Sequence, residues 1–414
     1  MSTLRILQVA HDHPDWTPGG TEIVARDLAR ALDARTGVAA RLVVAATALH
    51  RPEAAPGTLG AHGPDLVLRT GAYDRFMMRR LDGTAWIDAL ATVLAEVRPD
   101  IVHLHGIDRL GAEIVPVLRR LAPDVRVVMT LHDYQTICAN DGLMLTPDEG
   151  ARCFGASADA CRRCFPAQTA ARHALRRAHL LAVLSGVDLF LAPSAFLRDR
   201  FVAWGLPPER IRPMPNAVPV AAAPASDAPR PRRNRFAFFG TVARHKGVLV
   251  LLDAAARLAR AGDDVTVTFH GGLGHADAAF RADFADRLAA AAPVAQHLGP
   301  YVRGDVAALM ARTDWVVVPS LWWENAPLVI EEARAAGRPV IASGIGGMAE
   351  RVADGVDGLH VPPGDAAALA ETLRTATDPA LWRRLARATG RADHAAFVDG
   401  HLALYRSLLA RVPA

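Results

Sequence analysis

The chain has 414 residues, more than one ordinary hydrophobic core organises, so its length favours two domains of about 200 residues each. Lysine and arginine total 47 against 43 aspartates and glutamates, and a net charge of +4 is too small to indicate a nucleic-acid-binding protein. No apolar run long enough for a membrane span occurs, and the first residues lead into a strand instead of a signal peptide. We therefore expect a cytoplasmic protein, either soluble or peripheral at the inner membrane face.

An expected strand over residues 4–10 runs into a loop with two glycines and then into a helix over residues 23–32. Gly19 and Gly20 allow close backbone approach to a ligand, and Thr21 is a residue type that caps helices. This order suits a phosphate group, whereas a tight connection without a ligand is the alternative. The loop lacks the Gly-x-Gly-x-x-Gly pattern, so a Rossmann-like fold here need not bind NAD.

More strands alternate with helical stretches such as residues 86–97, a pattern that predicts a mostly parallel sheet covered by helices on both faces. Ligands of such sheets gather at the carboxyl ends of the strands. In the first half of the chain the further strands are expected at residues 41–47, 101–105, 125–130 and 188–192.

Histidines occupy two of these carboxyl ends. His103 and His105 alternate along one strand and therefore share a face, while His132 and Asp133 follow the next strand. Each histidine is either a hydrogen-bonded strand-end residue or a group that contacts a substrate.

All four cysteines, Cys138, Cys153, Cys161 and Cys164, fall within the segment 138–164. A cytoplasmic chain should not depend on disulfides, whereas four thiolates can close a tetrahedral zinc site that staples this Cys-rich insertion. Free thiols and disulfides are the alternatives. Four thiolates would leave zinc no open position, so this site is expected to be structural and not catalytic.

A helix expected over residues 168–184 carries five basic or imidazole side chains among alanines and leucines. This face is either solvated or in contact with an anionic membrane surface or a lipid-pyrophosphate acceptor. The five residues are Arg172, His173, Arg176, Arg177 and His179.

A strand-like segment at residues 211–216 ends the first domain, and the proline-rich residues 217–234 have the composition of a linker. The second domain opens with a strand at residues 236–241 and a glycine-flanked basic loop. In that loop the Lys246 ammonium can form an ion pair with a phosphate, and the Arg244 guanidinium can donate two hydrogen bonds to one. A solvated basic loop is the alternative.

The segment 315–332 reads as a strand, a short loop and a helix whose start is marked by Asn325 and Pro327. The free N–H groups at a helix start suit a diphosphate. Glu324 precedes the helix and Glu332 is expected two turns inside it, about 12 Å away at the helical rise. This spacing suits the two ends of a nucleotide sugar, whereas acids that only complement the helix dipole are the alternative.

The motifs around this helix resemble those of the family 4 retaining glycosyltransferases, also called glycosyltransferases group 1, which have GT-B architecture. The matching features are the Glu-x7-Glu pair, the Ala-x-Gly-x-Pro-Val strand at residues 335–340, the Gly-Gly-x-x-Glu turn at residues 346–350 and the segment 354–365. The resemblance implies two Rossmann-like, doubly wound parallel-sheet domains that face a cleft. They are an acceptor-side domain at residues 1–216 and a nucleotide-sugar domain at residues 235–388, with the final helix within residues 389–414 packed back on the first domain.

The resemblance also implies the activity, namely retaining transfer of a hexose from a UDP- or GDP-sugar to a glycan, a lipid-linked or a small-molecule acceptor. It implies that His105, with His103 as the alternative, faces the sugar, and that His132 and Asp133 lie on the acceptor side. His105, Glu324 and Lys246 are expected to be catalytic. The residues expected to bind the donor are Gly19, Gly20, Arg244, Lys246, Glu324, Asn325, Ala326, Pro327, Leu328 and Glu332.

Two features of the sequence qualify this assignment. Many family members have arginine after the strand-ending glycine where this chain has Thr241, so Arg244 is expected to compensate. No Asp-x-Asp motif occurs, so we expect catalysis without a metal or other cofactor. A nucleotide-sugar epimerase on the same fold and a catalytically silent nucleotide-sugar-binding protein are the competing interpretations; incubation with a nucleotide sugar alone separates the epimerase from the transferase.

Overall fold

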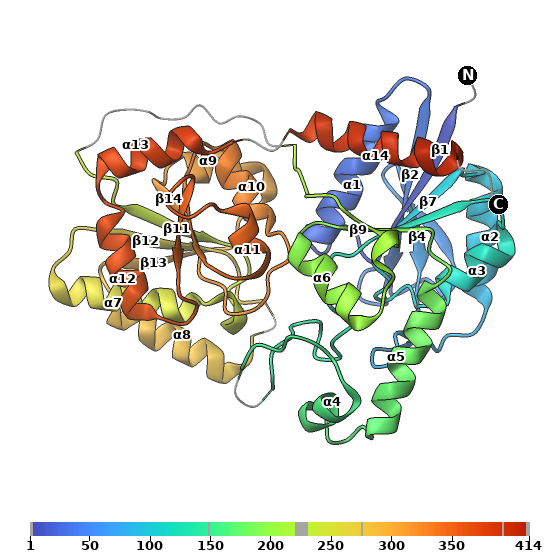
Figure 1. The fold of residues 1–414 in the computed structure, drawn as a ribbon, viewed down its shortest axis with the longest axis horizontal. Helices are drawn as coiled ribbons and strands as arrows, with labels where there is room; N and C mark the ends of the chain where they lie inside the picture. Colours follow the sequence, from blue (N-terminus) through green and yellow to red (C-terminus); the bar gives the residue numbers. More distant parts are fainter. Residues whose placement is uncertain (1–2, 148–149, 220–230, 275, 391–392, 411–414) are drawn as a thin grey trace. The chain divides into compact units, whose positions relative to one another are not determined.

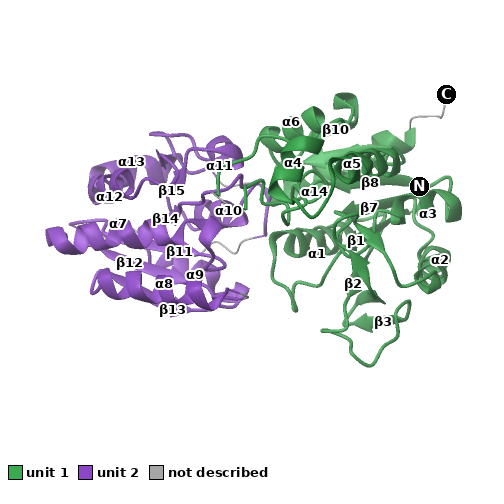
Figure 2. Cartoon of the chain, turned by 90° about the horizontal axis from the view of Figure 1, so that it is seen from below, with its two compact units in different colours: residues 1–216, 394–414 green, residues 217–393 purple. Residues whose placement is uncertain are grey.

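The computed structural model describes residues 3–147, 150–219, 231–274, 276–390 and 393–410. The chain divides into two compact units (Figure 2), the first formed by Met1–Asn216 with His394–Ala414 and the second by Ala217–Asp393. Each unit is built on a mainly parallel sheet, which confirms the predicted α/β class. The middle of the expected linker, residues 220–230, lies outside the described residues, and its flanks at 217–219 and 231–234 form neither helix nor strand.

The first unit is organised around an eight-stranded sheet, of which Figure 1 labels β1, β2, β4, β7 and β9. The strand order is β10-β9-β8-β7-β1-β2-β4-β3, and the pair of β3 and β4 is antiparallel. Strands β5 and β6 form a separate hairpin. The strand order reverses between β1 and β7, and such a reversal is where open α/β sheets bind ligands. The strands of this unit are β1 (Leu4–Ala10), β2 (Val38–Ala46), β3 (Leu59–His62), β4 (Asp65–Arg69), β5 (Tyr73–Asp74), β6 (Arg79–Arg80), β7 (Ile101–His105), β8 (Arg126–Thr130), β9 (Leu189–Ala192) and β10 (Ile211–Pro213).

Helices cover this sheet, and the last helix of the chain belongs to the same unit, where it contacts α1 (Figure 1). Alanines on α1 pack on small and branched side chains of β1, β2 and β4, which lets the helix approach the sheet closely. The helices are α1 (Gly20–Asp33), α2 (Ala85–Val97), α3 (Ile114–Leu121), α4 (Ala158–Cys164), α5 (Ala170–Leu184), α6 (Ala195–Trp204), the 3-10 turn η1 (Pro208–Arg210) and α14 (His394–Ala410).

The second unit has six parallel strands in the order β13-β12-β11-β14-β15-β16, and its order reverses between β11 and β14. This is the strand order of a dinucleotide-binding doubly wound sheet. The strands are β11 (Arg235–Phe239), β12 (Thr266–His270), β13 (Ala295–Gly299), β14 (Trp315–Val318), β15 (Val340–Ser343) and β16 (Gly358–Val361).

Successive side chains along the strands of the second unit point to opposite faces of the sheet and contribute to two hydrophobic cores, one on each face. Phe236 and Phe238 pack under α7, α8, α12 and α13, whereas Ala237 and Phe239 pack under α9, α10 and α11. The helical elements of this unit are η2 (Arg244–Lys246), α7 (Val248–Ala261), α8 (Ala278–Ala290), η3 (Arg303–Asp305), α9 (Val306–Ala311), α10 (Leu328–Ala335), α11 (Gly346–Arg351), α12 (Ala366–Thr375) and α13 (Pro379–Ala388).

Candidate functional site

In the second unit, the loops that follow β11 and β14 meet at the point where the strand order reverses. Gly247 ends the first loop at a φ of +71°, and a Cβ there would lie 1.8 Å from the carbonyl oxygen of Pro319. Only glycine accepts both the backbone angle and this contact. The amide of Leu321 also donates to the carbonyl of His245 at 2.8 Å. Backbone contacts therefore hold the two loops in one arrangement.

These loops bring together Lys246 and Glu324, which the sequence separates by 78 positions. The Lys246 ammonium donates to Glu324 Oε1 at 2.6 Å, and the Ser320 hydroxyl donates to the same oxygen at 2.8 Å. Burial alone would raise the pKa of Glu324, but the charge and hydrogen bond of Lys246 hold that pKa below its usual value. Lys246 also lies 5.1 Å from the Trp322 ring. The carboxylate is thus ionised, buried and fixed in position.

The helix after this loop begins later than the sequence suggests. α10 starts at Leu328 with Pro327 in the N-cap position and no side-chain cap, so Asn325 does not cap the helix as predicted. Residues 324–327 are not helical, and Glu332 lies little more than one turn inside α10. The expected separation of about 12 Å between Glu324 and Glu332 required a continuous helix from residue 324 to residue 332. Because residues 324–327 are not helical, this expectation is wrong.

The first residues of α11 support the same loop. The Gly347 amide donates to the carbonyl of Glu324 at 2.9 Å, and a Cβ on Gly347 would lie 1.5 Å from the carbonyl oxygen of Asn325. Ala326 and Leu328 remain partly exposed. The N-terminal end of α10, four residues after Glu324, is therefore partly exposed, and in its first turn the amide of Ile330 donates to the carbonyl of Pro327 at 3.0 Å.

The two neighbouring glutamates of α10 have different surroundings. Glu331 is buried and accepts from the Arg351 guanidinium at 2.7 Å, so its charge is neutralised inside the unit. Glu332 is also buried and lies close enough to Tyr301 for its charge, after burial, to help raise the pKa of that phenol. Glu331 is therefore engaged inside the unit, and Glu332, the predicted partner of Glu324, lies near Tyr301.

Arg244 is oriented toward α8 and not toward the Lys246–Glu324 pair. Its side chain is 62% exposed, its guanidinium lies 3.7 Å from the Asp283 carboxylate, and it stands 5.3 Å from the Phe280 ring. An exposed ion pair of this kind costs little to break. Arg244 would have to leave Asp283 before it could bind a ligand at the ends of β11 and β14.

In the first unit, a row of buried polar side chains runs along the sheet beneath α14. His103 and His105 do share a face, as predicted, and the row joins them to Gln8, Thr130 and Tyr405. His103 Nδ1 lies 2.6 Å from the Tyr405 hydroxyl and its Nε2 lies 2.7 Å from Thr130 Oγ1. His105 Nε2 lies 2.7 Å from Gln8 Oε1, and the Gln8 amide nitrogen donates to Tyr405 at 3.3 Å. Tyr405 of α14 therefore holds Gln8 of β1 and His103 of β7 in position.

This row determines the tautomers of the histidines. Since Gln8 presents its oxygen, His105 donates from Nε2 and accepts at Nδ1 from His132 Nε2, which is 2.9 Å away. His132 consequently directs an unprotonated Nδ1 away from the row. Burial lowers the pKa of His103 and His105 well below the usual value and lowers that of His132 to about 3, so all three rings are neutral.

The exposure of these rings refines the predicted roles. His105 is fully buried and its two ring nitrogens have protein partners, whereas His132 is partly exposed at the end of β8. His132 and Asp133 line a small cavity beyond the ends of β7 and β8. Burial also raises the pKa of Asp133 to about 6. The structure therefore places His132 and Asp133 at the surface of this site, with His105 behind them.

An ion pair that the sequence motifs did not predict joins the loop after β1 to the first turn of α1. His11 Nε2 lies 2.7 Å from the carboxylate of Glu22, and although burial opposes it, this carboxylate raises the pKa of His11 to about 9. Thr21 does not cap α1, because Gly19 takes the N-cap position without a side-chain bond. A Cβ on Gly19 would lie 2.4 Å from the Glu22 carboxylate. A histidine directly after a strand and an acid in the first helical turn were the available signals.

The four cysteines are free thiols in and around α4, and all four line a cavity of about 290 Å³. Among the described residues, which include all four, no three of these sulfurs lie within 4.8 Å of one another. The predicted zinc site on Cys138, Cys153, Cys161 and Cys164 is therefore not assembled in this arrangement, because a tetrahedral ion needs its ligands closer together. Burial raises the pKa of Cys138 and Cys161, which favours the neutral thiol.

Two arginines of the predicted basic helix have structural partners. The buried Arg176 guanidinium donates to the carbonyls of Phe76 and Thr136, each at 2.6 Å, and Arg177 donates to the carbonyl of Trp204 at 2.7 Å. These two side chains fix α5 to its neighbours and do not form a free basic surface. Within the described part of the chain, no helix combines the length and apolar character that crossing a membrane requires.

Comparison with known proteins identifies both parts of the chain. The family model described as "Glycosyltransferase Family 4" matches residues 18–222, and the model described as "Glycosyl transferases group 1" matches residues 233–378. A D-inositol 3-phosphate glycosyltransferase of Catenulispora acidiphila is 32% identical over 251 residues, which are 55% of this chain and 59% of that protein. A glycogen synthase of Mycobacterium tuberculosis is 34% identical over 175 residues, 42% of this chain and 41% of that protein. The chain thus spans about half the length of these relatives.

Solved structures share the fold across nearly the whole chain. A sucrose-phosphate synthase from Thermosynechococcus elongatus has a TM-score of 0.73 at 20% identity, with 98% of this chain and 99% of that chain covered. The Anabaena protein HepE, solved with UDP and glucose, has a TM-score of 0.68 at 18% identity, with 98% and 100% covered. At these identities the likeness establishes the GT-B fold alone.

Proposed function

This chain belongs to the family 4, or group 1, glycosyltransferases of GT-B architecture, and we propose that it transfers a hexose from a nucleotide sugar to an acceptor hydroxyl with retention of configuration. The observation that carries the proposal is the Lys246–Glu324 pair beside the start of α10, at the reversal of strand order in the second unit. A buried carboxylate next to a cation and the N-terminal end of a helix offers what a sugar diphosphate requires.

In this proposal each group of the second unit has one role toward the donor. Glu324 accepts hydrogen bonds from hydroxyls of the transferred sugar, and Glu332 accepts those of the ribose. Lys246 and the first N–H groups of α10 bind the diphosphate, and Arg244 joins them after leaving Asp283. Since these groups stabilise the charge of the departing diphosphate, they support transfer without a divalent metal.

The acceptor is proposed to meet His132 and Asp133 in the first unit. The acceptor oxygen bonds to the anomeric carbon on the face from which the diphosphate leaves, and the leaving phosphate oxygen takes the acceptor's proton. His105 then positions His132 through the 2.9 Å hydrogen bond. A glycan, a lipid-linked sugar and a small molecule all offer the required hydroxyl. Because HepE was solved with UDP-glucose, UDP-sugars are the first donors to test.

The test measures binding and turnover in matched variants. UDP- and GDP-sugars are screened by thermal shift, since a ligand that binds the folded state raises its stability. Donor hydrolysis and transfer are then measured in Glu324→Gln and Lys246→Ala, with Arg384→Ala as a control that removes an exposed cation from the same unit. We expect a loss of about 100-fold or more in the two site variants. Full activity in both would refute the assignment, and a new nucleotide sugar formed without acceptor would indicate an epimerase.

A further inference from the structure

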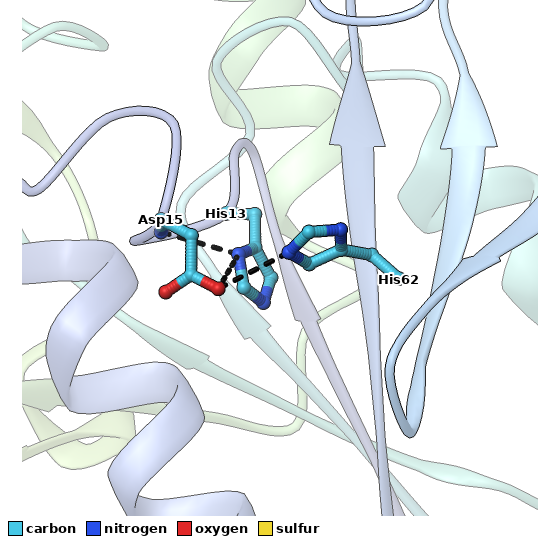
Figure 3. Close-up of side chains that lie close together, drawn as sticks. All are labelled: His13, Asp15 and His62. Atoms are coloured by element: carbon cyan, nitrogen blue, oxygen red, sulfur yellow. Dashed lines mark hydrogen bonds and ion pairs between the residues drawn. The ribbon is translucent and has the colours of Figure 1, made fainter.

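Two histidines and one aspartate form a cluster in the first unit that the glycosyl-transfer site does not use. His13 and Asp15 lie on the loop after β1, and His62 ends the edge strand β3 (Figure 3). One ligand atom from each residue lies within 4.8 Å of the other two. Among the described residues this is the one trio of histidine, cysteine or acidic side chains that meets this criterion. We call it the His13 cluster.

The spacing of the cluster fits a small divalent ion. Asp15 Oδ2 lies 3.6 Å from His13 Nδ1 and 3.1 Å from His62 Nε2. Two ligands that each lie about 2.0–2.1 Å from a tetrahedral zinc ion are about 3.3 Å apart, which falls between these two distances. The same side chains in Figure 3 point toward one common space. Asp15 is therefore at the required spacing from both rings, and the ligand nitrogens of His13 and His62 lie within 4.8 Å of each other.

Hydrogen bonds around the cluster fix the tautomer and the orientation of His13. His13 is almost fully buried, and its Nε2 lies 3.1 Å from the buried carboxylate of Asp65. An imidazole that donates its outer N–H to a carboxylate presents the other nitrogen as a fixed lone pair, which is the usual arrangement of a metal-binding histidine. The amide of Asp15 donates to that lone pair at 3.2 Å, which confirms that Nδ1 accepts. A bound ion would replace this amide.

The remaining contacts leave one side of the cluster open. Arg26 donates to Asp15 Oδ1 at 2.9 Å and so orients the carboxylate with Oδ2 toward the two rings. The side chains of Asp15 and His62 are 53% and 35% exposed, which gives an ion and a coordinated water access from solvent. Without metal, the same 3.1 Å contact is a hydrogen bond between His62 Nε2 and Asp15, and metal titration distinguishes the two states.

We propose that the His13 cluster binds a divalent transition-metal ion of the zinc type, with His13 Nδ1, Asp15 Oδ2 and His62 Nε2 as ligands and water in the fourth position. Two imidazoles and one carboxylate suit zinc, nickel or copper better than magnesium or calcium. The ion would join the β1–α1 loop to the β3 edge of the sheet. This inference is independent of the proposed glycosyl transfer, because neither donor nor acceptor enters it.

The test titrates the metal-stripped chain of residues 1–414 with zinc chloride by calorimetry, with magnesium chloride as the control ion. The variants are His62→Gln and Asp15→Asn, whose side chains are partly exposed and can be replaced without opening a cavity in the core. Circular dichroism checks that each variant folds. Because thiols also bind zinc, the Cys161→Ser/Cys164→Ser variant is measured in parallel. Trp16 provides a second readout, since its ring lies 5.0 Å from His62 and nickel bound there would quench its fluorescence.

We expect one zinc site, and the cysteine variant should retain it. Residues that only hydrogen-bond to a metal ligand typically contribute roughly 10–100-fold to metal affinity. The affinity for zinc should fall by more than this in His62→Gln and in Asp15→Asn, because each removes a ligand. Asp65→Asn should weaken binding within that range. Nickel should quench the wild type, and a Trp16→Phe variant should lose this quenching. Zinc binding that is unchanged in both ligand variants, zinc binding that disappears in the cysteine variant, or no zinc binding at all would overturn the proposal.

Discussion

Replacement of Lys246 by alanine tests the electrostatics of the donor site without any substrate. The substitution removes the ammonium that lies 2.6 Å from Glu324, whose side chain is 7% exposed, and leaves Ser320 as a remaining donor. Loss of a hydrogen bond to a charged group costs about 1.5–3 kcal/mol, and breaking a fully buried ion pair costs about 3–5 kcal/mol. Since Lys246 is 26% exposed and Ser320 stays, we expect the free energy of unfolding to fall by about 2 kcal/mol at pH 7.

The pH dependence of this loss identifies its cause. In the wild type, the lowered pKa of Glu324 contributes stability above the unfolded-state pKa and loses it as the pH falls through the folded-state value. In Lys246→Ala, burial is no longer offset, so the pKa of Glu324 rises and protonation favours the folded variant. The difference between the two proteins should therefore be largest near neutral pH and shrink as the pH falls toward about 4.3.

Urea denaturation at several pH values, followed by circular dichroism, measures this difference. The double-mutant cycle with Glu324→Gln is the control, because Lys246→Ala should cost little when its partner carries no charge. A loss below about 0.5 kcal/mol at pH 7, or an equal loss in both backgrounds, would show that the pair does not hold the site together.

Three further results are expected. Tyr405→Phe leaves a buried imidazole nitrogen without its 2.6 Å partner and should lower the free energy of unfolding by about 1–3 kcal/mol in denaturant titrations; an unchanged value would contradict the buried hydrogen-bonded row. Gly347→Ala places a Cβ against the carbonyl of Asn325 and should weaken nucleotide binding in calorimetry, whereas wild-type affinity would contradict the packing. Glu22→Gln should lower the pKa of His11 from about 9 in an NMR titration. The stability that the raised pKa of His11 adds, which is full below pH 6.5 and lost as the pH rises through about 9, should then disappear from the stability profile.

The sequence predicted most strands of the two sheets because buried parallel strands are continuous runs of apolar, often branched residues. It missed β3, β4 and β16, which are short or lie at the sheet edges. β3 and β4 enclose a Gly-Pro turn and β3 has only one large apolar residue, so no alternating pattern marks it. This omission also concealed the His13 cluster, since His62 lies on β3 and Asp65 on β4. A metal-ligand set whose members are 47 positions apart can be recognised only once the hairpin is placed beside the first loop.

At the candidate donor site too, the sequence does not reveal the partners of a residue, even when two residues are adjacent. Glu331 and Glu332 are identical in type, and spacing alone does not say which of them is neutralised inside the unit. The structure shows that Arg351 of α11 binds Glu331, a contact between residues 20 positions apart that spacing within the helix does not predict. Likewise, a constant helical rise between Glu324 and Glu332 was a natural assumption, but Gly347 holds residues 324 and 325 in a loop that is not helical. Motif spacing therefore identifies candidate residues, whereas their charge state and direction depend on partners from distant segments.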